Sequence, residues 1–179
     1  MQRIAVFCGA SLGNDPVIRE AATATGISIA QRGMGVVYGG GHVGLMGLVA
    51  DAALSVGGEV IGVIPDFMQK AEQAHTTVSQ LILVKTMHER KMRMHRLSHA
   101  VMALPGGFGT MDEIFELLTW RQLDLHRQPI GLLNVNGFYD HLLAQFQRME
   151  HDGFLHGETR VIVESEVDVL LDRLVSAMH

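Results

Sequence analysis

Two glycine-rich segments of the sequence contain the residue types that bind anions. The first is VVYGGGHVGLMG at positions 36–47, and the second is VMALPGGFGTMDE at positions 101–113. Glycine lets a backbone approach a ligand closely, and the free N–H groups at the start of a helix attract negative charge. The two segments therefore predict a bound phosphate, held by a phosphate loop of Gly39, Gly40, Gly41, Gly44 and Gly106.

Neither segment has the residue order of the common nucleotide-binding motifs. The order GxxxxGK[ST] is absent, and neither segment fits GxGxxG followed by an acidic residue at the end of the next strand. The sequence therefore disfavours ATP hydrolysis and hydride transfer. A single glycine-rich turn can also be purely conformational, so the pair by itself indicates only an affinity for anions.

Thr110 and Glu113 allow two interpretations. Their spacing is that of a capping box, in which Thr110 caps a helix and Glu113 bonds back to the cap, a pair worth about 1 kcal/mol. A carboxylate at this place could instead act on a bound ligand. The residue types alone leave both open, whereas the helix dipole is enough to explain the neighbouring Asp112.

The segment TMHERKMRMHRLSHA predicts a helix with an arginine on its apolar face. At about 100° per residue, Met87, Met94 and Leu97 form one stripe, and Arg90 lies within it. A buried guanidinium is costly unless a carboxylate or a phosphate pairs with it. Arg90 is therefore predicted to have either an internal acidic partner or a bound ligand.

Short apolar runs alternate with longer helical patterns along the whole chain. The predicted strands are Ile4–Cys8, Gly35–Tyr38, Val60–Ile64, Leu81–Val84, Ala100–Leu104, Ile130–Leu133 and Val161–Val163. The predicted helices cover about 16–32, 44–56, 87–98, 110–125, 138–151 and 166–178. This alternation predicts a single α/β domain over residues 1–179, a Rossmann-like, doubly wound and mostly parallel sheet with helices on both faces. Ligands of such folds bind beyond the carboxyl ends of the strands, where both glycine-rich segments begin.

The composition excludes several classes of partner. With 19 acidic residues against 14 Lys and Arg and no long basic run, we expect no nucleic-acid partner. No apolar run approaches the roughly 20 residues that span a membrane. The only cysteine, Cys8, excludes an intrachain disulfide and suits a cytoplasmic location. Without a cysteine cluster or a carboxylate array, we expect no bound metal.

The motifs GGGHVGLMG, MHERK and PGGFGTMDE together closely resemble those of the cytokinin-activating nucleoside 5′-monophosphate phosphoribohydrolases, the "lonely guy" family, whose members are often labelled lysine decarboxylase-like. The likeness covers nearly the whole chain, from CGAS to PIGLLNVNGFYD. It implies hydrolysis of the N-glycosidic bond of N6-modified AMP, without a cofactor, to a free base and ribose 5-phosphate. It also implies a homodimer with the active site near the subunit interface.

The resemblance further implies that Arg90 and Glu113 are the catalytic pair. The matching substrate-binding positions are Glu72, Arg90, Lys91, Gly107, Phe108, Gly109, Thr110, Met111, Asp112, Glu113 and Thr119. The chemistry agrees, because cleavage builds positive charge on the ribose, and a carboxylate can stabilise that charge or activate water.

Three other activities are alternatives to this reaction. One is a broader nucleosidase acting on AMP or other nucleoside monophosphates, and another is a nucleotide-binding protein that uses the same loops without turnover. Lysine decarboxylation is disfavoured because it would normally need pyridoxal phosphate on a lysine. None of the three lysines, Lys70, Lys85 and Lys91, lies in a recognisable setting for that cofactor.

Overall fold

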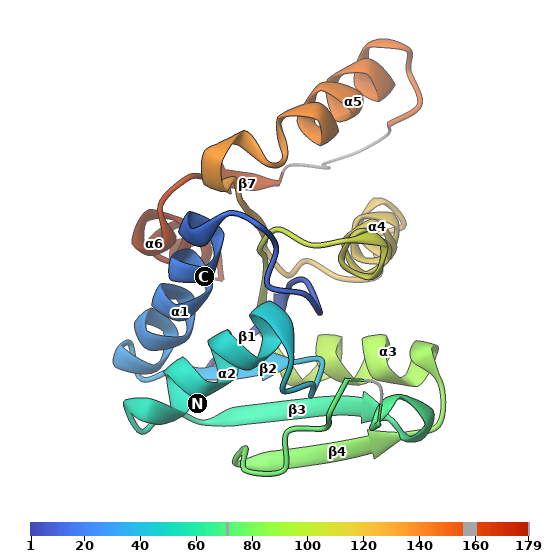
Figure 1. The fold of residues 1–179 in the computed structure, drawn as a ribbon. Helices are drawn as coiled ribbons and strands as arrows, with labels where there is room; N and C mark the ends of the chain where they lie inside the picture. Colours follow the sequence, from blue (N-terminus) through green and yellow to red (C-terminus); the bar gives the residue numbers. More distant parts are fainter. Residues whose placement is uncertain (71, 156–160, 179) are drawn as a thin grey trace.

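The computed structural model describes residues 1–70, 72–155 and 161–178. Within these residues, seven strands form one parallel sheet in the order β4-β3-β2-β1-β5-β6-β7 (Figure 1). The strands are β1 (Arg3–Phe7), β2 (Gly35–Tyr38), β3 (Val60–Pro65), β4 (Gln80–Val84), β5 (Ala100–Ala103), β6 (Ile130–Leu133) and β7 (Ile162–Glu164). The α-helices are α1 (Pro16–Gln31), α2 (Gly44–Ser55), α3 (Met87–Leu97), α4 (Phe108–Gln122), α5 (Asp140–His151) and α6 (Val167–Ala177).

The predicted fold class is confirmed, and the element boundaries are close to those expected. Each predicted strand lies within one residue of the observed one, and each helix within three. The sequence pattern did not predict two short 3-10 turns, η1 (Asp66–Met68) and η2 (Val135–Gly137). Across the described part of the chain, no helix is long and apolar enough to cross a membrane.

The order of the strands reverses at β1, in the centre of the sheet. The chain first builds one half through β2, β3 and β4, and then crosses to the other side of β1 to place β5. Loops that leave β1 and β5 therefore diverge at the carboxyl edge of the sheet. In open α/β sheets this reversal produces the crevice in which ligands bind.

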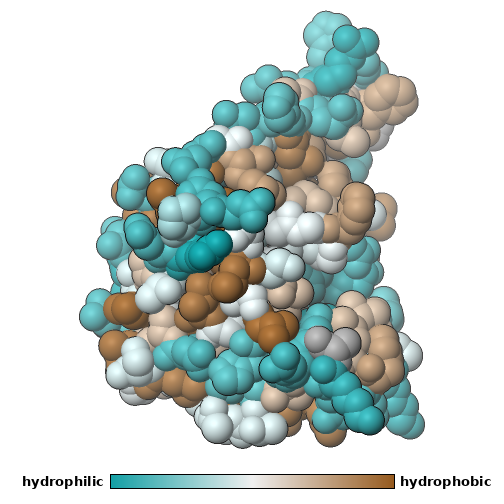
Figure 2. Space-filling model, viewed as in Figure 1, coloured by the Kyte–Doolittle hydropathy of each residue, from teal (hydrophilic) through white to brown (hydrophobic). Residues whose placement is uncertain are grey.

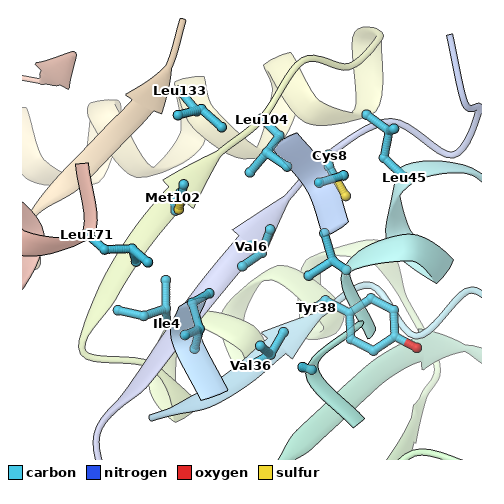
Figure 3. Packing of buried hydrophobic residues seen from close by; sticks show 14 of the residues in the cluster. Ile4, Val6, Cys8, Val36, Tyr38, Leu45, Met102, Leu104, Leu133 and Leu171 are labelled. Atoms are coloured by element: carbon cyan, nitrogen blue, oxygen red, sulfur yellow. The ribbon is translucent and has the colours of Figure 1, made fainter. Parts of the chain in front are cut away.

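Helices cover both faces of the sheet and form two apolar cores. Alternation along β1 sends Ile4 and Val6 to the face covered by α1, α2 and α6, and Ala5 and Phe7 to the face covered by α3, α4 and α5. Figure 3 shows the first of these cores around Val6, Tyr38 and Met102. Burial on both faces explains why the strand sequences are continuously apolar.

Candidate active site

A cavity of about 500 Å³ opens at the carboxyl edge of the sheet, where the strand order reverses. The loop after β1 lines one side with residues 8–13, and the loop after β5 lines another with Pro105, Gly106 and Gly107. Helix α3 contributes Arg90, and α4 contributes Glu113. The volume is within the usual range for small-molecule sites.

Helix α4 begins at Phe108, so the capping-box interpretation of Thr110 and Glu113 is wrong. The N-cap is Gly107, whose extended backbone (φ −95°, ψ −153°) starts the helix without a side-chain cap. Thr110 is already inside the first turn, and its side chain packs against Gly106, where a Cβ would lie 2.1 Å from Thr110 Oγ1. Glycine is a tolerated N-cap and costs little compared with Ser or Thr, which lets the helix start earlier than the Thr pattern indicates.

The uncapped start of α4 faces the cavity. Gly107, Gly109 and Thr110 line the wall. The N–H group of Met111 is bonded to Gly107 O at 3.1 Å. The N–H groups before Met111 have no acceptor within the helix, as in the first turn of any α-helix. They give the cavity a set of donors and a partial positive charge that suit an anion.

Arg90 is 4% exposed, as its place in the apolar stripe predicted. Its Nε donates to Val63 O at 3.1 Å, and its Nη2 donates to Gly39 O at 2.8 Å and Glu72 Oε2 at 3.1 Å. Its Nη1 has only the weak acceptor Met68 Sδ, at 3.8 Å, among the described residues. Arg90 therefore has an internal acidic partner and also keeps donors for a ligand at the cavity wall.

Glu72 lies in the loop between β3 and β4 and lines the same cavity. The loop is fixed to the first glycine segment, because the N–H of His42 bonds to Glu72 O at 3.1 Å and the N–H of His75 bonds to Gly40 O at 2.9 Å. Burial raises the pKa of Glu72, and the Arg90 charge acts in the opposite direction. Glu72, which the resemblance implies as a substrate-binding position, thus borders the same cavity as Arg90 and bonds to it.

Glu113 is 9% exposed and lines the cavity from the second turn of α4. Burial raises the pKa of its carboxyl to about 7, partly opposed by the Arg90 charge and assisted by Glu72. A carboxyl with this pKa exists in both protonation states near neutral pH. Such perturbed groups in a cleft are typical of catalytic acids and bases.

Several sequence-predicted residues lie away from the cavity wall. Lys91 Nζ lies 3.0 Å from Asp112 Oδ2 and 3.0 Å from Glu116 Oε2, so this side chain forms two ion pairs and does not line the cavity. Phe108 is 96% exposed, and Met111 packs against the core. Thr119 donates to Phe115 O and lines a second cavity, between α4 and α5.

The glycines predicted as a phosphate loop divide into two groups. Gly39 and Gly106 line the cavity. Gly40, Gly41 and Gly44 instead permit close packing: a Cβ at Gly44 (φ +66°) would lie 2.2 Å from the carbonyl carbon of Ala10. Close packing therefore explains Gly40, Gly41 and Gly44. Gly39 and Gly106 border the cavity.

The sequence pattern missed one wall of the cavity. The loop after β1, including Gly9 and Ser11, and the side chains of Met68, Met87 and Phe138 also line it. The signal for the β1 loop is its place beside the reversal of strand order. That order depends on how strands pair across the sheet, which the sequence periodicity does not contain.

Comparison with known proteins identifies relatives of this chain. Residues 46–173 match the model of a family described as "Possible lysine decarboxylase". The chain is 48% identical over 163 residues to the probable cytokinin riboside 5'-monophosphate phosphoribohydrolase LOGL1 of Oryza sativa subsp. japonica, covering 91% of this chain and 73% of that protein. It is 43% identical over 164 residues to the cytokinin riboside 5'-monophosphate phosphoribohydrolase LOG2 of Arabidopsis thaliana, covering 92% and 77% respectively.

Solved structures show the same fold. The molybdenum cofactor binding protein of Rippkaea orientalis matches with a TM-score of 0.76 and 22% identity, covering 99% of this chain and 98% of that one. At this identity the likeness concerns the fold alone. The family match and the curated relatives agree with the resemblance carried by MHERK and PGGFGTMDE. The chain belongs to the family described as possible lysine decarboxylases, together with the cytokinin riboside 5'-monophosphate phosphoribohydrolases of rice and Arabidopsis.

Proposed function

We propose that this chain hydrolyses the N-glycosidic bond of N6-modified adenosine 5′-monophosphates, giving the free base and ribose 5-phosphate. The observation that carries the proposal is the placement of Arg90 and Glu113 on one cavity with the open start of α4. Both relatives described above are named as cytokinin riboside 5'-monophosphate phosphoribohydrolases, which supports the same reaction class.

The anion-binding part of the cavity suits the 5′-phosphate of such a substrate. The phosphate would lie at the start of α4, where backbone N–H groups and the helix dipole provide a positive environment. Apolar side chains on the rest of the wall, including Leu45, Met46 and Phe138, suit the base. A nucleotide would thus span the cavity from the loop after β5 toward α2 and η2.

The charged pair suits the chemistry at the ribose. In its ionised form Glu113 would stabilise the positive charge that develops on the sugar, and it could accept a proton from the attacking water. Arg90, fixed by Val63, Gly39 and Glu72, would present Nη1 to a substrate oxygen without losing its orientation. Glu72 is thus assigned to position Arg90.

Lysine decarboxylation has less support from the site. Lys91 is engaged by Asp112 and Glu116, and Lys70 and Lys85 are exposed and do not line the cavity. A Schiff-base lysine needs a pocket that lowers its pKa, but the ion pairs of Lys91 raise its pKa against the opposing effect of burial. The family description therefore names lysine decarboxylation, but none of these three lysines is placed to form a Schiff base in the cavity.

A product assay tests the proposed reaction. The purified chain is incubated with isopentenyladenosine monophosphate and with AMP, and free base and ribose 5-phosphate are measured. We expect product from the wild type and from Glu116→Gln, a carboxylate of α4 that binds Lys91 outside the cavity, but not from Glu113→Gln. Binding of either nucleotide without product in the wild type would instead favour the non-catalytic alternative.

We also infer that the chain forms a homodimer through α4 and α5. Phe115, on α4, is exposed and forms an edge-to-face contact with Phe146, on α5. Beside them lies the second cavity, about 480 Å³ and mainly apolar, which Thr119 also lines. Figure 2 shows apolar surface on α4 and on the neighbouring side of α5. A second copy covering this surface would remove it from water and would bring Thr119 into a subunit interface.

The location proposed for the chain is the cytoplasm. Cys8 is a free thiol in the described structure and is buried at the end of β1. Burial raises the pKa of this thiol far above its usual range, so it stays protonated and behaves as a small apolar side chain. A fold built without a disulfide suits a reducing compartment.

A further inference from the structure

Three potential metal ligands lie together outside the cavity. His42 lies within the first glycine-rich segment, directly after Gly41. Asp51 lies on α2, and His75 comes from the loop between β3 and β4. One ligand atom from each lies within 4.8 Å of the others. The mechanism proposed above uses none of the three side chains, and none lines the cavity.

The distances between the ligand atoms suit a small metal ion. His75 Nε2 lies 2.8 Å from Asp51 Oδ1, and His42 Nε2 lies 3.3 Å from Asp51 Oδ2. The two imidazole rings are stacked, with centroids 4.1 Å apart. Ligands that bind zinc at about 2.0–2.2 Å in a tetrahedron are roughly 3.3–3.6 Å from one another. The Asp51–His42 separation already matches this spacing, and the Asp51–His75 separation would lengthen by about 0.5 Å on binding. The three ligand atoms lie within 4.8 Å of one another, so a rotation of the exposed His42 side chain toward His75 would complete the site.

The buried histidine also has the second contact that metal-binding histidines need. His75 is 1% exposed, and its Nδ1 lies 3.1 Å from Thr77 Oγ1. With a metal on Nε2, the neutral ring carries its proton on Nδ1 and can donate it to the Thr77 hydroxyl. Without a metal, Nε2–H can donate to Asp51 while the hydroxyl donates to Nδ1. The same neighbours thus satisfy both states.

The other two ligands leave the site accessible. The side chains of His42 and Asp51 are 50% and 54% exposed, so an ion can enter from solvent and a water molecule can complete its coordination. Two imidazoles with one carboxylate favour zinc, cobalt, nickel or copper over magnesium and calcium, which prefer oxygen ligands alone.

We propose that His42, Asp51 and His75 bind one transition-metal ion of the zinc class in a structural role. The ion would join α2 to two segments that border the active-site cavity. His42 belongs to the first glycine-rich segment, and its N–H bonds to the carbonyl groups of Glu72 and Gln73. Binding would therefore stabilise the loop that carries the acidic partner of Arg90.

Metal titration of the apo-protein tests the site. The purified chain is dialysed against EDTA and titrated with Co²⁺, followed by its visible absorption, and with Zn²⁺ in a calorimeter. We expect one tight equivalent in the wild type, lost in His42→Ala and Asp51→Asn. The control is His88→Ala, which removes an exposed histidine of α3 and should leave binding unchanged.

Thermal unfolding gives a second measurement that does not depend on activity. A ligand that binds only the folded chain raises the unfolding temperature. Zn²⁺ should therefore stabilise the wild type and the His88→Ala variant, but not the His42→Ala variant. Both exposed substitutions, His42→Ala and Asp51→Asn, avoid removing the buried His75 ring. Equal metal binding by the wild type and His42→Ala, or no tight equivalent in the wild type, would overturn the proposal.

Discussion

At the scale of single residues, the proposed reaction depends on one carboxyl, Glu113, whose buried environment disfavours the ionised form. Glu113 is buried beside Arg90 and Glu72, and the net effect raises its pKa to about 7. The role proposed for Glu113 requires the ionised form. Its protonation equilibrium should therefore be visible both in the reaction and in the stability of the fold.

The first prediction concerns the pH dependence of the reaction. As pH rises through about 7, Glu113 loses its proton, so kcat/KM for isopentenyladenosine monophosphate should rise and then level off. Glu113→Gln should lower kcat by about 100-fold or more and abolish this step, while Glu116→Gln should keep it. Steady-state rates between pH 5 and 9 measure both effects. A profile that falls above pH 7 would instead identify Glu113 as a proton donor.

The second prediction concerns stability. Because the folded pKa is raised, the folded chain holds the Glu113 proton more tightly than the unfolded chain, and stability falls as pH rises from about 4.5 to about 7. The full change corresponds to about 3 kcal/mol. Glu113→Gln should remove it, so the variant gains stability relative to the wild type at pH 8 but not at pH 4. Urea unfolding at both pH values is the measurement, and equal differences would contradict it.

At the scale of elements, the start of α4 determines which backbone groups line one wall of the cavity. The helix begins at a glycine without a side-chain cap, and Thr110 packs against the backbone of Gly106. This arrangement leaves the first N–H groups free for a ligand. Gly106, in the loop before α4, and Gly109, in its first turn, should therefore respond differently to the same added methyl group.

The third prediction compares Gly106→Ala with Gly109→Ala. A Cβ at Gly106 would lie 2.1 Å from Thr110 Oγ1 and 2.9 Å from the backbone nitrogen of Gly9, so this substitution should destabilise the fold by about 1–3 kcal/mol. A Cβ at Gly109 meets nothing within 4 Å, and alanine there should stabilise α4 by up to about 1 kcal/mol. Chemical denaturation measures both. Equal effects would show that the packing of Gly106 does not matter.

The sequence patterns predicted the elements well, for a clear physical reason. Strands buried on both faces must be apolar throughout, and helices with one buried face must repeat at the helical period. Arg90 stood out because it broke such a repeat. The start of α4 was not predicted, because Thr110 fits a cap pattern while the N-cap Gly107 has no side chain to signal it.

The parts that were not predicted depend on how distant segments meet. The loop after β1 borders the cavity because β1 is the strand at which the sheet order reverses. His42, Asp51 and His75 come from three segments that only the folded sheet brings together. Neither arrangement leaves a local spacing that a motif could describe.

At the scale of the whole molecule, the proposed dimer depends on the surface of α4 and α5. The fourth prediction is that the wild type is a dimer in solution and that Phe115→Glu is monomeric, because a charge would be buried in the proposed interface. Val169→Glu, on the exposed face of α6, is the control and should remain dimeric. Light scattering after size exclusion gives the masses. A monomeric wild type, or a dimeric Phe115→Glu, would contradict the proposed interface.

The central place of β1 has a kinetic consequence. Ile4 pairs with Val36 on one side and with Ala100 on the other, so the middle of the sheet cannot close until a long stretch of chain has been ordered. Pairings between such distant residues cost loop-closure entropy before they are stabilised, and they slow folding. During refolding, the half of the sheet built from β1 to β4 can form first, with one side of β1 still unpaired. That unpaired edge is where a partly folded chain would be most prone to associate with another.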